Sequence, residues 1–201
     1  YEFGCLTTSM IDSLVDLIRE CFPVSYSSES ITNLITEPRN YNEGVFYQKS
    51  LVGMIVGRVK SFSLLNYEDL KVDNEFSNLP KTCSVGYLML IGVTDNHRHN
   101  KIGSTLLKNF TQHAMKNNCQ AIYLHTHSEN EAAMNFYKKH NFNYSHTIQA
   151  FYNFYDKDQP ANLMYQILPE PQVGLPWYPR SNIINRRLLN CLMDPFSHNN
   201  N

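Results

Sequence analysis

The sequence has no excess of basic charge and no long apolar run. Its 201 residues include 17 Lys and Arg against 18 Asp and Glu, which gives a formal net charge of −1. Proteins that bind nucleic acid usually carry a basic stripe or patch, so the composition argues against such a partner. No apolar run approaches the roughly 18 residues that a membrane-spanning helix requires. We therefore expect a folded domain without a helix that crosses a membrane.

Cysteine is scarce, and no CxxC pair occurs in the sequence. The five cysteines are odd in number and widely spaced, at Cys5, Cys21, Cys83, Cys119 and Cys191. Such a pattern indicates neither a disulfide framework nor a cysteine zinc site. We therefore expect reduced, mostly buried thiols and no metal. Internal repeats and low-complexity segments are also missing from the sequence.

Helix-like and strand-like segments follow one another along the first 168 residues. Hydrophobic residues make up 42% of the chain, which is enough for one folded core. Apolar residues at helical spacing predict helices at 7–22, 28–35, 102–118 and 130–142. Alternating or continuous apolar runs predict a hairpin at 45–62 and strands at 84–93, 121–126, 142–148 and 161–168.

The order of these segments predicts the fold class. Strand–helix–strand–helix in the middle of the chain favours parallel pairing there, whereas the two ends favour antiparallel pairing. The continuous apolar run at 84–93 is typical of a strand buried on both faces. We therefore expect an α/β (α+β) domain over residues 1–168, with a mixed twisted sheet of about seven strands flanked by about four helices.

Two segments differ from this core in character. Residues 62–82 are polar and irregular, which indicates a long surface insertion. Residues 169–201 begin with a proline-rich connector and continue into a short amphipathic segment. At 181–193 an apolar stripe lies beside Arg186 and Arg187, so this segment is predicted to lie on a membrane surface. Packing on the domain itself or on a partner helix is the alternative.

The stretch "NHRHNKIGSTLL" (96–107) joins a predicted strand to a predicted helix. A helix N-terminus offers unpaired backbone N–H groups and a partial positive charge, and therefore binds phosphate groups. Gly103 lets a phosphate approach the backbone closely. Arg98, His99 and Lys101 add positive side chains, and Ser104 adds a hydroxyl. The alternative is an ordinary polar loop, and the turn alone does not decide between the two.

A second motif follows one strand later, and the two motifs together resemble a known family. "NEAAMNFYKKHNF" fits the spacing N-x-x-A-x-x-F-Y-x-x-x-x-F on Asn130, Ala133, Phe136, Tyr137 and Phe142. With R/Q-x-x-G-x-G/A on the preceding turn, this resembles the GNAT superfamily of N-acetyltransferases. Lys101 stands where that family usually has its first glycine.

Other stretches narrow the resemblance within the superfamily. "FPVSY", "VGMIVGRVK", "YLMLIGV" and "AIYLH" are similar to the protein N-terminal acetyltransferases. The insertion at 62–82 and Pro176-Trp177 are similar to the NatF type, with the catalytic subunit of the NatE type as a near relative. The resemblance covers about residues 5–178 and implies a single domain that binds acetyl-CoA as co-substrate.

The resemblance also implies where acetyl-CoA would bind. Its pantetheine arm would pair with the strand backbone near Gly92, its pyrophosphate would sit on the turn at 99–104, and Tyr137 would support the leaving thiolate. The residues implied in cofactor binding are Ile91, Gly92, Val93, Arg98, His99, Asn100, Lys101, Ile102, Gly103, Ser104, Asn130, Tyr137, Lys138, Lys139 and His140. The resemblance implies no metal.

Tyr87 and His125 are the candidate catalytic residues. An α-ammonium group has a pKa of about 7.7 to 8.0 and must lose a proton before it attacks a thioester, a task that suits histidine. The family places Tyr87 and His125 across a gap between two neighbouring strands, with a bridging water as proton carrier. By residue type alone, His125 could equally be a hydrogen-bonded core histidine, and Tyr87 an ordinary strand aromatic.

The expected partner is the N-terminal peptide of another protein. By resemblance, the residues that hold it would be Phe22, Tyr26, Tyr87, Met89 and Tyr152. Phe22 and Met89 would form an apolar slot, so we expect Met followed by a hydrophobic residue or Lys. We further expect a monomer on the cytosolic face of Golgi membranes. Two alternatives stay open at this point: a histone or protein lysine acetyltransferase, and a non-catalytic adaptor that binds acetyl-CoA.

Overall fold

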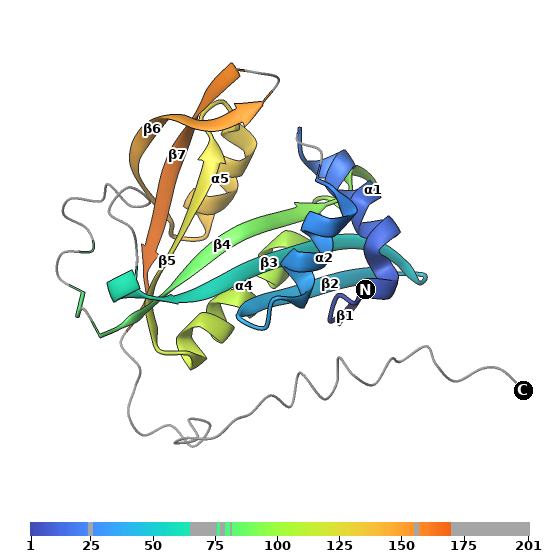
Figure 1. Ribbon diagram of the computed structural model, residues 1–201, viewed down its shortest axis with the longest axis horizontal. Coiled ribbons are helices and arrows are strands. Elements are labelled where there is room, and N and C mark those ends of the chain that lie inside the picture. Colours follow the sequence, from blue (N-terminus) through green and yellow to red (C-terminus); the bar gives the residue numbers. More distant parts are fainter. Residues whose placement is uncertain (24–25, 65–75, 77–78, 81, 155–156, 170–201) are drawn as a thin grey trace, which may run out of the picture.

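A mixed β-sheet forms the middle of the molecule. The computed structural model of the protein describes residues 1–23, 26–64, 76, 79–80, 82–154 and 157–169. The sheet has seven strands in the order β1-β2-β3-β4-β5-β7-β6 (Figure 1), and only β4 and β5 pair in parallel. The expected mixed sheet is confirmed. Its strands are β1 (Glu2–Gly4), β2 (Asn40–Tyr47), β3 (Ser50–Ser61), β4 (Ser84–Val93), β5 (Cys119–His127), β6 (Asn143–Phe154) and β7 (Lys157–Ile167).

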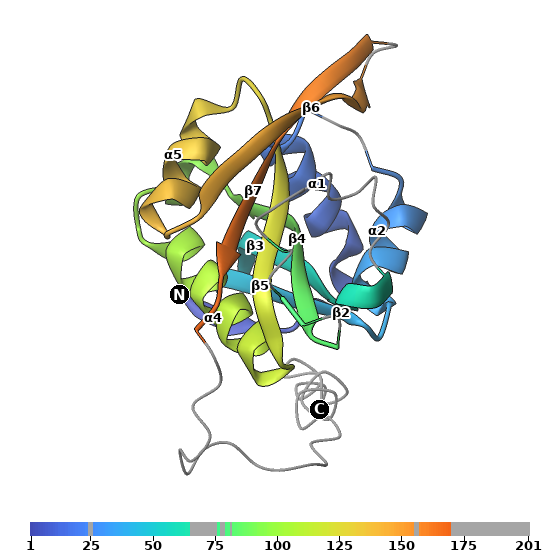
Figure 2. The same ribbon diagram turned by 90° about the vertical axis from the view of Figure 1, so that its left-hand side faces the viewer.

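Helices cover both faces of this sheet, as Figure 2 shows. One face packs against α1 (Ile11–Cys21) and α2 (Ser28–Thr36), and the other against α4 (Ile102–Lys116) and α5 (Glu131–Lys139). The four helices expected by spacing are thus present in the described residues. Short 3-10 turns are η1 (Thr8–Met10), η2 (Phe62–Leu64) and η3 (Asp95–His97). Within the described ranges, no helix combines the length and the apolar character needed to cross a membrane.

The apolar stripe of α4 packs at the centre of the core. Its residues recur at helical spacing and are all buried: Ile102, Leu106, Phe110 and Ala114. Phe110 lies against Gly57 of β3, where a Cβ atom would come within 2.3 Å of the Phe110 ring. The absence of a side chain at Gly57 therefore lets α4 lie close to the sheet. This packing fixes the helix whose N-terminus begins at Ile102, just after the end of β4.

Strand β4 differs from its sequence prediction in burial, and it contains a bulge. Its side chains alternate between buried and half-buried, so the expectation of burial on both faces is wrong. The reason is that pairing with β5 stops at Leu88, opposite Leu124, and the two strands then diverge (Figure 1). Against β3, Leu88 pairs with Gly57 and Leu90 with Val56, so Met89 is an extra, bulged residue. A bulge of this kind bends a strand and redirects its side chains.

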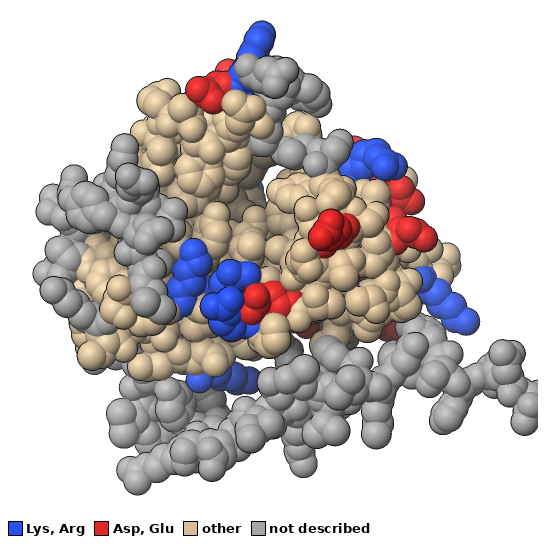
Figure 3. Space-filling view, in the orientation of Figure 1, with Lys and Arg blue, Asp and Glu red and all other residues tan. Residues whose placement is uncertain are grey.

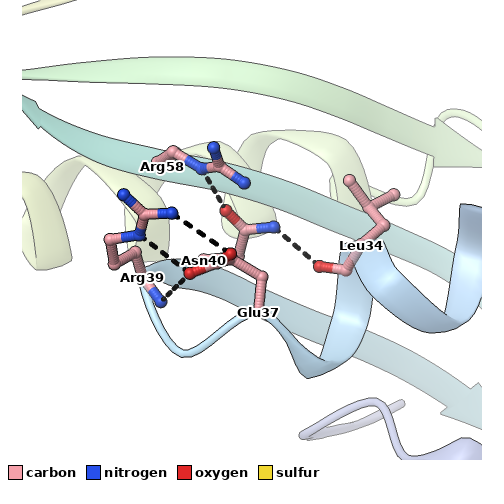
Figure 4. A network of polar contacts seen from close by, with 5 residues as sticks. All are labelled: Leu34, Glu37, Arg39, Asn40 and Arg58. Carbon is pink, nitrogen blue, oxygen red and sulfur yellow. Dashed lines mark hydrogen bonds and ion pairs between the residues drawn. The ribbon is translucent and has the colours of Figure 1, made fainter.

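Polar contacts tie the end of α2 to strands β2 and β3 (Figure 4). The Asn40 side chain donates to the Leu34 carbonyl at 2.7 Å and accepts from Arg58 Nε at 2.6 Å. Asn42 likewise donates to the Ile35 carbonyl at 2.9 Å. The last carbonyls of a helix have no intrahelical partner, and these amides satisfy two of them. These contacts hold α2 in place against the sheet.

Two expectations about the periphery need correction. Phe76, from the expected surface insertion at 62–82, is 2% exposed, and its ring centroid lies 5.6 Å from that of Tyr165. The insertion therefore contributes an apolar anchor to the core. Cys21, Cys83 and Cys119 are free thiols, as expected, but Cys5 is disulfide-bonded. The predicted amphipathic segment at 181–193 lies outside the described residues.

Candidate functional site

Tyr87 and His125 meet where β4 and β5 separate. His125 follows Leu124, the last β5 residue that pairs with β4, and Tyr87 lies one residue before the end of that pairing on β4. The Tyr87 hydroxyl is 3.3 Å from His125 Nδ1, and both side chains are half-buried. This distance leaves no room for the expected bridging water between these two atoms. The structure thus brings the two candidate catalytic residues into direct hydrogen-bond range.

Aromatic neighbours hold this pair in position. The His125 ring stacks on Phe151 of β6 with centroids 4.1 Å apart, and the Tyr87 ring stacks on Tyr123 at 4.8 Å. His127, two residues along the same strand, has a different environment. Its Nδ1 accepts from the Glu129 backbone N–H, and its Nε2 lies 3.3 Å from Gln159 Oε1. These contacts connect the end of β5 to the turn that follows it and to β7. His125 is the one whose ring lies within hydrogen-bond range of the Tyr87 hydroxyl, whereas the His127 ring stacks on that of Tyr152 with centroids 6.5 Å apart.

Tyrosines surround the pair on the side away from α4. Burial raises the pKa of Tyr152 well above its ordinary value, and the nearby hydroxyls of Tyr87 and Tyr26 raise it further. Burial likewise raises the pKa of Tyr137, with a further contribution from Tyr152. These hydroxyls therefore stay protonated at neutral pH and can donate hydrogen bonds. The structure brings Tyr26, Tyr87, Tyr137 and Tyr152 close to one another.

The turn before α4 adopts an unusual backbone. His99 and Lys101 have left-handed φ values of 64° and 61°, and Lys101 is the N-cap of α4 with no side-chain cap. Glycine adopts this conformation without steric cost, which explains a family preference for glycine at the position of Lys101. The first N–H groups of α4, at Ile102, Gly103 and Ser104, have no partner within the helix. The turn therefore presents the backbone N–H groups on which the prediction of an anion site rests.

The charges on this turn are arranged differently from the expectation. Arg98 is bound to its own loop: Nη2 lies 2.7 Å from Asp95 Oδ1, and Nε donates to the Val93 carbonyl at 3.1 Å. Its charge is therefore partly neutralised. Lys101 is exposed, as are Lys138 and Lys139 at the end of α5. Lys101 is thus better placed than Arg98 to bind a phosphate at this helix N-terminus.

Other expected cofactor residues have partners within the protein. Asn130 Oδ1 accepts from the Ala133 N–H at 3.0 Å and so caps α5. Ser104 Oγ lies 3.0 Å from His140 Nε2, and burial lowers the pKa of His140. Ile91, Gly92 and Val93 pair with β3 on one side. Their other edge is beyond the end of the β4–β5 pairing, so it can bind the amide groups of a ligand.

The expected peptide residues Phe22 and Met89 lie in one apolar cluster with α1 and α2. A Cβ atom on Gly92 would be 3.0 Å from Cys21 Sγ and 3.3 Å from the Phe22 ring, so α1 ends directly over β4. Burial raises the pKa of the Cys21 thiol, which keeps this wall neutral. Phe22 and Met89 are half-buried and can line a slot for an apolar side chain.

The space-filling view shows the surface hollowed between the β6–β7 arm and the α1–α2 side of the molecule (Figure 3). Two cavities of about 240 and 180 Å³ lie elsewhere, beside the β2–β3 hairpin and behind α4. We place the site at the hollow, because the Tyr87–His125 pair and the open β4 edge lie on this side. Among the described residues, no group of three or more His, Cys, Asp or Glu could hold a metal ion.

Two contacts of the site were not expected. Phe151 of β6 provides the stack for His125, whereas the residue expected from this strand was its neighbour Tyr152. The Lys60 ammonium of β3 lies 4.9 Å from the centroid of the Tyr87 ring. The alternation in "GRVKS" could have shown that Arg58 and Lys60 share a face of the strand. The pairing of β3 with β4, which brings Lys60 to Tyr87, could not be read from the sequence.

Comparison with known proteins gives a consistent result. Residues 11–142 match the family described as Acetyltransferase (GNAT) family. N-alpha-acetyltransferase 60 of Danio rerio is 30% identical over 146 residues, which cover 71% of this chain and 60% of that protein. The protein of the same name from Drosophila melanogaster is 27% identical over 163 residues, covering 70% and 59%. The chain therefore spans about 60% of the length of these curated relatives.

Solved structures share the fold. Arabidopsis thaliana NAA60 in complex with a bisubstrate analogue matches with a TM-score of 0.73 and 18% identity, covering 85% of this chain and 99% of that one. Arabidopsis thaliana Naa50 in complex with the bisubstrate analogue CoA-Ac-MVNAL matches with a TM-score of 0.64 and 24% identity, covering 83% and 98%. At these identities the structural likeness shows the fold alone.

Proposed function

Since the chain belongs to the acetyltransferase (GNAT) family, we propose that it transfers the acetyl group of acetyl-CoA to the free α-amino group of protein N-termini. The observation that carries this proposal is the Tyr87–His125 contact at the divergence of β4 and β5. A proton acceptor stands there beside a strand edge that can bind amide groups. The helix N-terminus at Lys101–Ser104, which suits phosphates, follows the same strand.

The chemistry requires the residues to accept one proton and to stabilise the thiolate that leaves. The amine nitrogen attacks the thioester carbonyl carbon, the carbon–sulfur bond breaks, and the nitrogen loses a proton. His125, in contact with the Tyr87 hydroxyl, accepts that proton. The CoA sulfur leaves as a thiolate, and we assign its stabilisation to Tyr137, whose raised pKa keeps the hydroxyl protonated so that it can donate a hydrogen bond to the sulfur. The half-buried, aromatic surroundings limit competing attack by water.

The tyrosines favour an α-amine over a lysine side chain as the acceptor. Tyr87 and Tyr26 both lie close enough to Tyr152 to raise its pKa. These tyrosines narrow the entrance to the site, so that the end of a peptide chain fits better than a lysine side chain in the middle of one. A lysine acetyltransferase would use the same cofactor site, and a silent adaptor would bind acetyl-CoA without turnover. The neutral apolar wall of Phe22 and Met89 fits the first side chain of a peptide that begins with Met.

We expect a preference for Met followed by a hydrophobic residue or Lys, because Phe22 and Met89 offer an apolar slot. The measurement is a library of N-terminal peptides incubated with acetyl-CoA and read by mass spectrometry. Phe22→Ser should weaken the preference for Met by about tenfold, as expected when a buried apolar contact is lost. Selection of peptides that begin with Ser or Ala would contradict the proposed preference. Attachment to Golgi membranes through the tail stays a prediction.

A further inference from the structure

The Lys60 ammonium lies over the ring of Tyr87. Lys60 is half-buried on β3, and its Nζ is 4.9 Å from the Tyr87 ring centroid. The strand register explains the contact, because Arg58 pairs with Tyr87 and Lys60 with the neighbouring Val85. A cation at this distance from an aromatic face is attracted by the ring. Lys60 is therefore held beside the catalytic pair by its contact with the Tyr87 ring.

The described residues that contact the pair include a cation and several neutral aromatic groups. Arg58 shares a strand face with Lys60 and is bound to Asn40, a neutral partner. His125, Tyr123 and Tyr152 face Tyr87 from β5 and β6. The ion pairs of the described residues join Asp16, Glu37 and Asp95 to other cations. The charge observed directly over the Tyr87 ring is that of the Lys60 ammonium.

We propose that Lys60 sets the working pH of the acetyl transfer, by favouring the deprotonated forms of the Tyr87–His125 pair and of the amine that approaches it. This inference rests on the proposed function. Lys60 acts through its contact with Tyr87 and through the electrostatic field of its ammonium group. It takes no part in making or breaking bonds, so it is a positioning residue.

The sign of the effect is the same for every group concerned. A nearby positive charge disfavours the imidazolium form of His125 and the ammonium form of the substrate, and it favours the phenolate form of Tyr87. Each group therefore loses its proton at a lower pH than it would without Lys60. At a separation of about 7 Å, one unit charge shifts a titration by about 0.5 to 1 pH unit at a partly exposed site.

The test is the pH dependence of kcat for Lys60→Met at saturating acetyl-CoA and peptide. We expect the acid limb to move upward by about 0.5 to 1 pH unit, so that the rate at pH 7 falls about three- to tenfold and recovers near pH 9. Lys60→Arg should keep the wild-type profile. Lys108→Met, on the exposed side of α4, removes the same charge far from the site and should leave the profile unchanged.

Two further measurements separate this inference from the proposed function. In wild type, about 0.5 M NaCl should move the acid limb toward that of Lys60→Met, because salt screens exposed charges. NMR titration of the His125 ring needs no turnover, and its pKa should be about half a unit higher in Lys60→Met or Lys60→Gln. An unchanged ring titration, or an arginine variant that behaves like the methionine variant, would overturn the role of Lys60. Absence of peptide acetylation by wild type would overturn the proposed function instead.

Discussion

Replacement of His125 by Phe is expected to lower the rate of acetyl transfer at least tenfold, with little change in affinity for acetyl-CoA. Loss of a general base typically lowers rates by about 10² to 10⁴. Phenylalanine preserves the stack on Phe151, so the fold should be retained. Initial rates from pH 6 to 9 and calorimetric binding of acetyl-CoA give the two quantities.

Tyr87 and His125 should behave as one unit. Their atoms are 3.3 Å apart, so Tyr87→Phe should also lower the rate, and the double variant should lose less than the two single losses combined. His127→Ala is the matched control, because this histidine contacts Gln159 and the Glu129 backbone rather than Tyr87. We expect it to have a milder effect. Wild-type activity of His125→Phe across this pH range would remove His125 from the mechanism.

The second large effect is expected for Gly103→Glu. Gly103 lies in the first turn of α4, and a Cβ atom there would make only ordinary contacts, at 3.5 Å from the Phe136 ring. The added carboxylate would repel a phosphate and compete for the free N–H groups, so the Kd for acetyl-CoA should rise about ten- to hundredfold. The same negative charge stabilises a helix N-terminus. The melting temperature of the free protein should therefore not fall.

Gly103→Ala is the control for this experiment. It adds the Cβ atom without the charge, and we expect the affinity for acetyl-CoA to stay within about threefold of wild type. Calorimetry and thermal melts of the three proteins supply the comparison. Equal affinities for the glutamate variant and wild type would mean that the phosphates bind away from the N-terminus of α4.

Much of the fold could be predicted from the sequence, because the apolar periods are strong. The stripe on α4 and the run at 84–93 identify elements whose burial drives the packing. The bulge at Met89 could not be predicted, since it depends on the register between two strands. The burial of Phe76 was also missed, because one aromatic residue in a polar segment has no period to reveal it.

The candidate site was predicted unevenly for similar reasons. A short-range pattern identified the turn before α4, and the family resemblance named the tyrosines, but neither could show how the side chains are already bound. Arg98 is paired with Asp95, three residues earlier, and Asn130 is used as a helix cap. The left-handed backbone of Lys101 could not be predicted from its residue type, because glycine and asparagine adopt that φ far more often than lysine does. Contacts between strands, such as Lys60 over Tyr87, need the three-dimensional pairing.

The identity of the acetylated nitrogen tests the central claim most directly. The measurement uses one peptide with a free N-terminal Met followed by Leu and with a single internal Lys, incubated with the protein and acetyl-CoA. Fragment ions from mass spectrometry then locate the acetyl group, and a copy of the peptide with a blocked N-terminus serves as the control. The account predicts acetylation of the α-nitrogen and no reaction of the blocked peptide. Acetyl groups on the lysine Nε, or equal reaction of the blocked peptide, would contradict it.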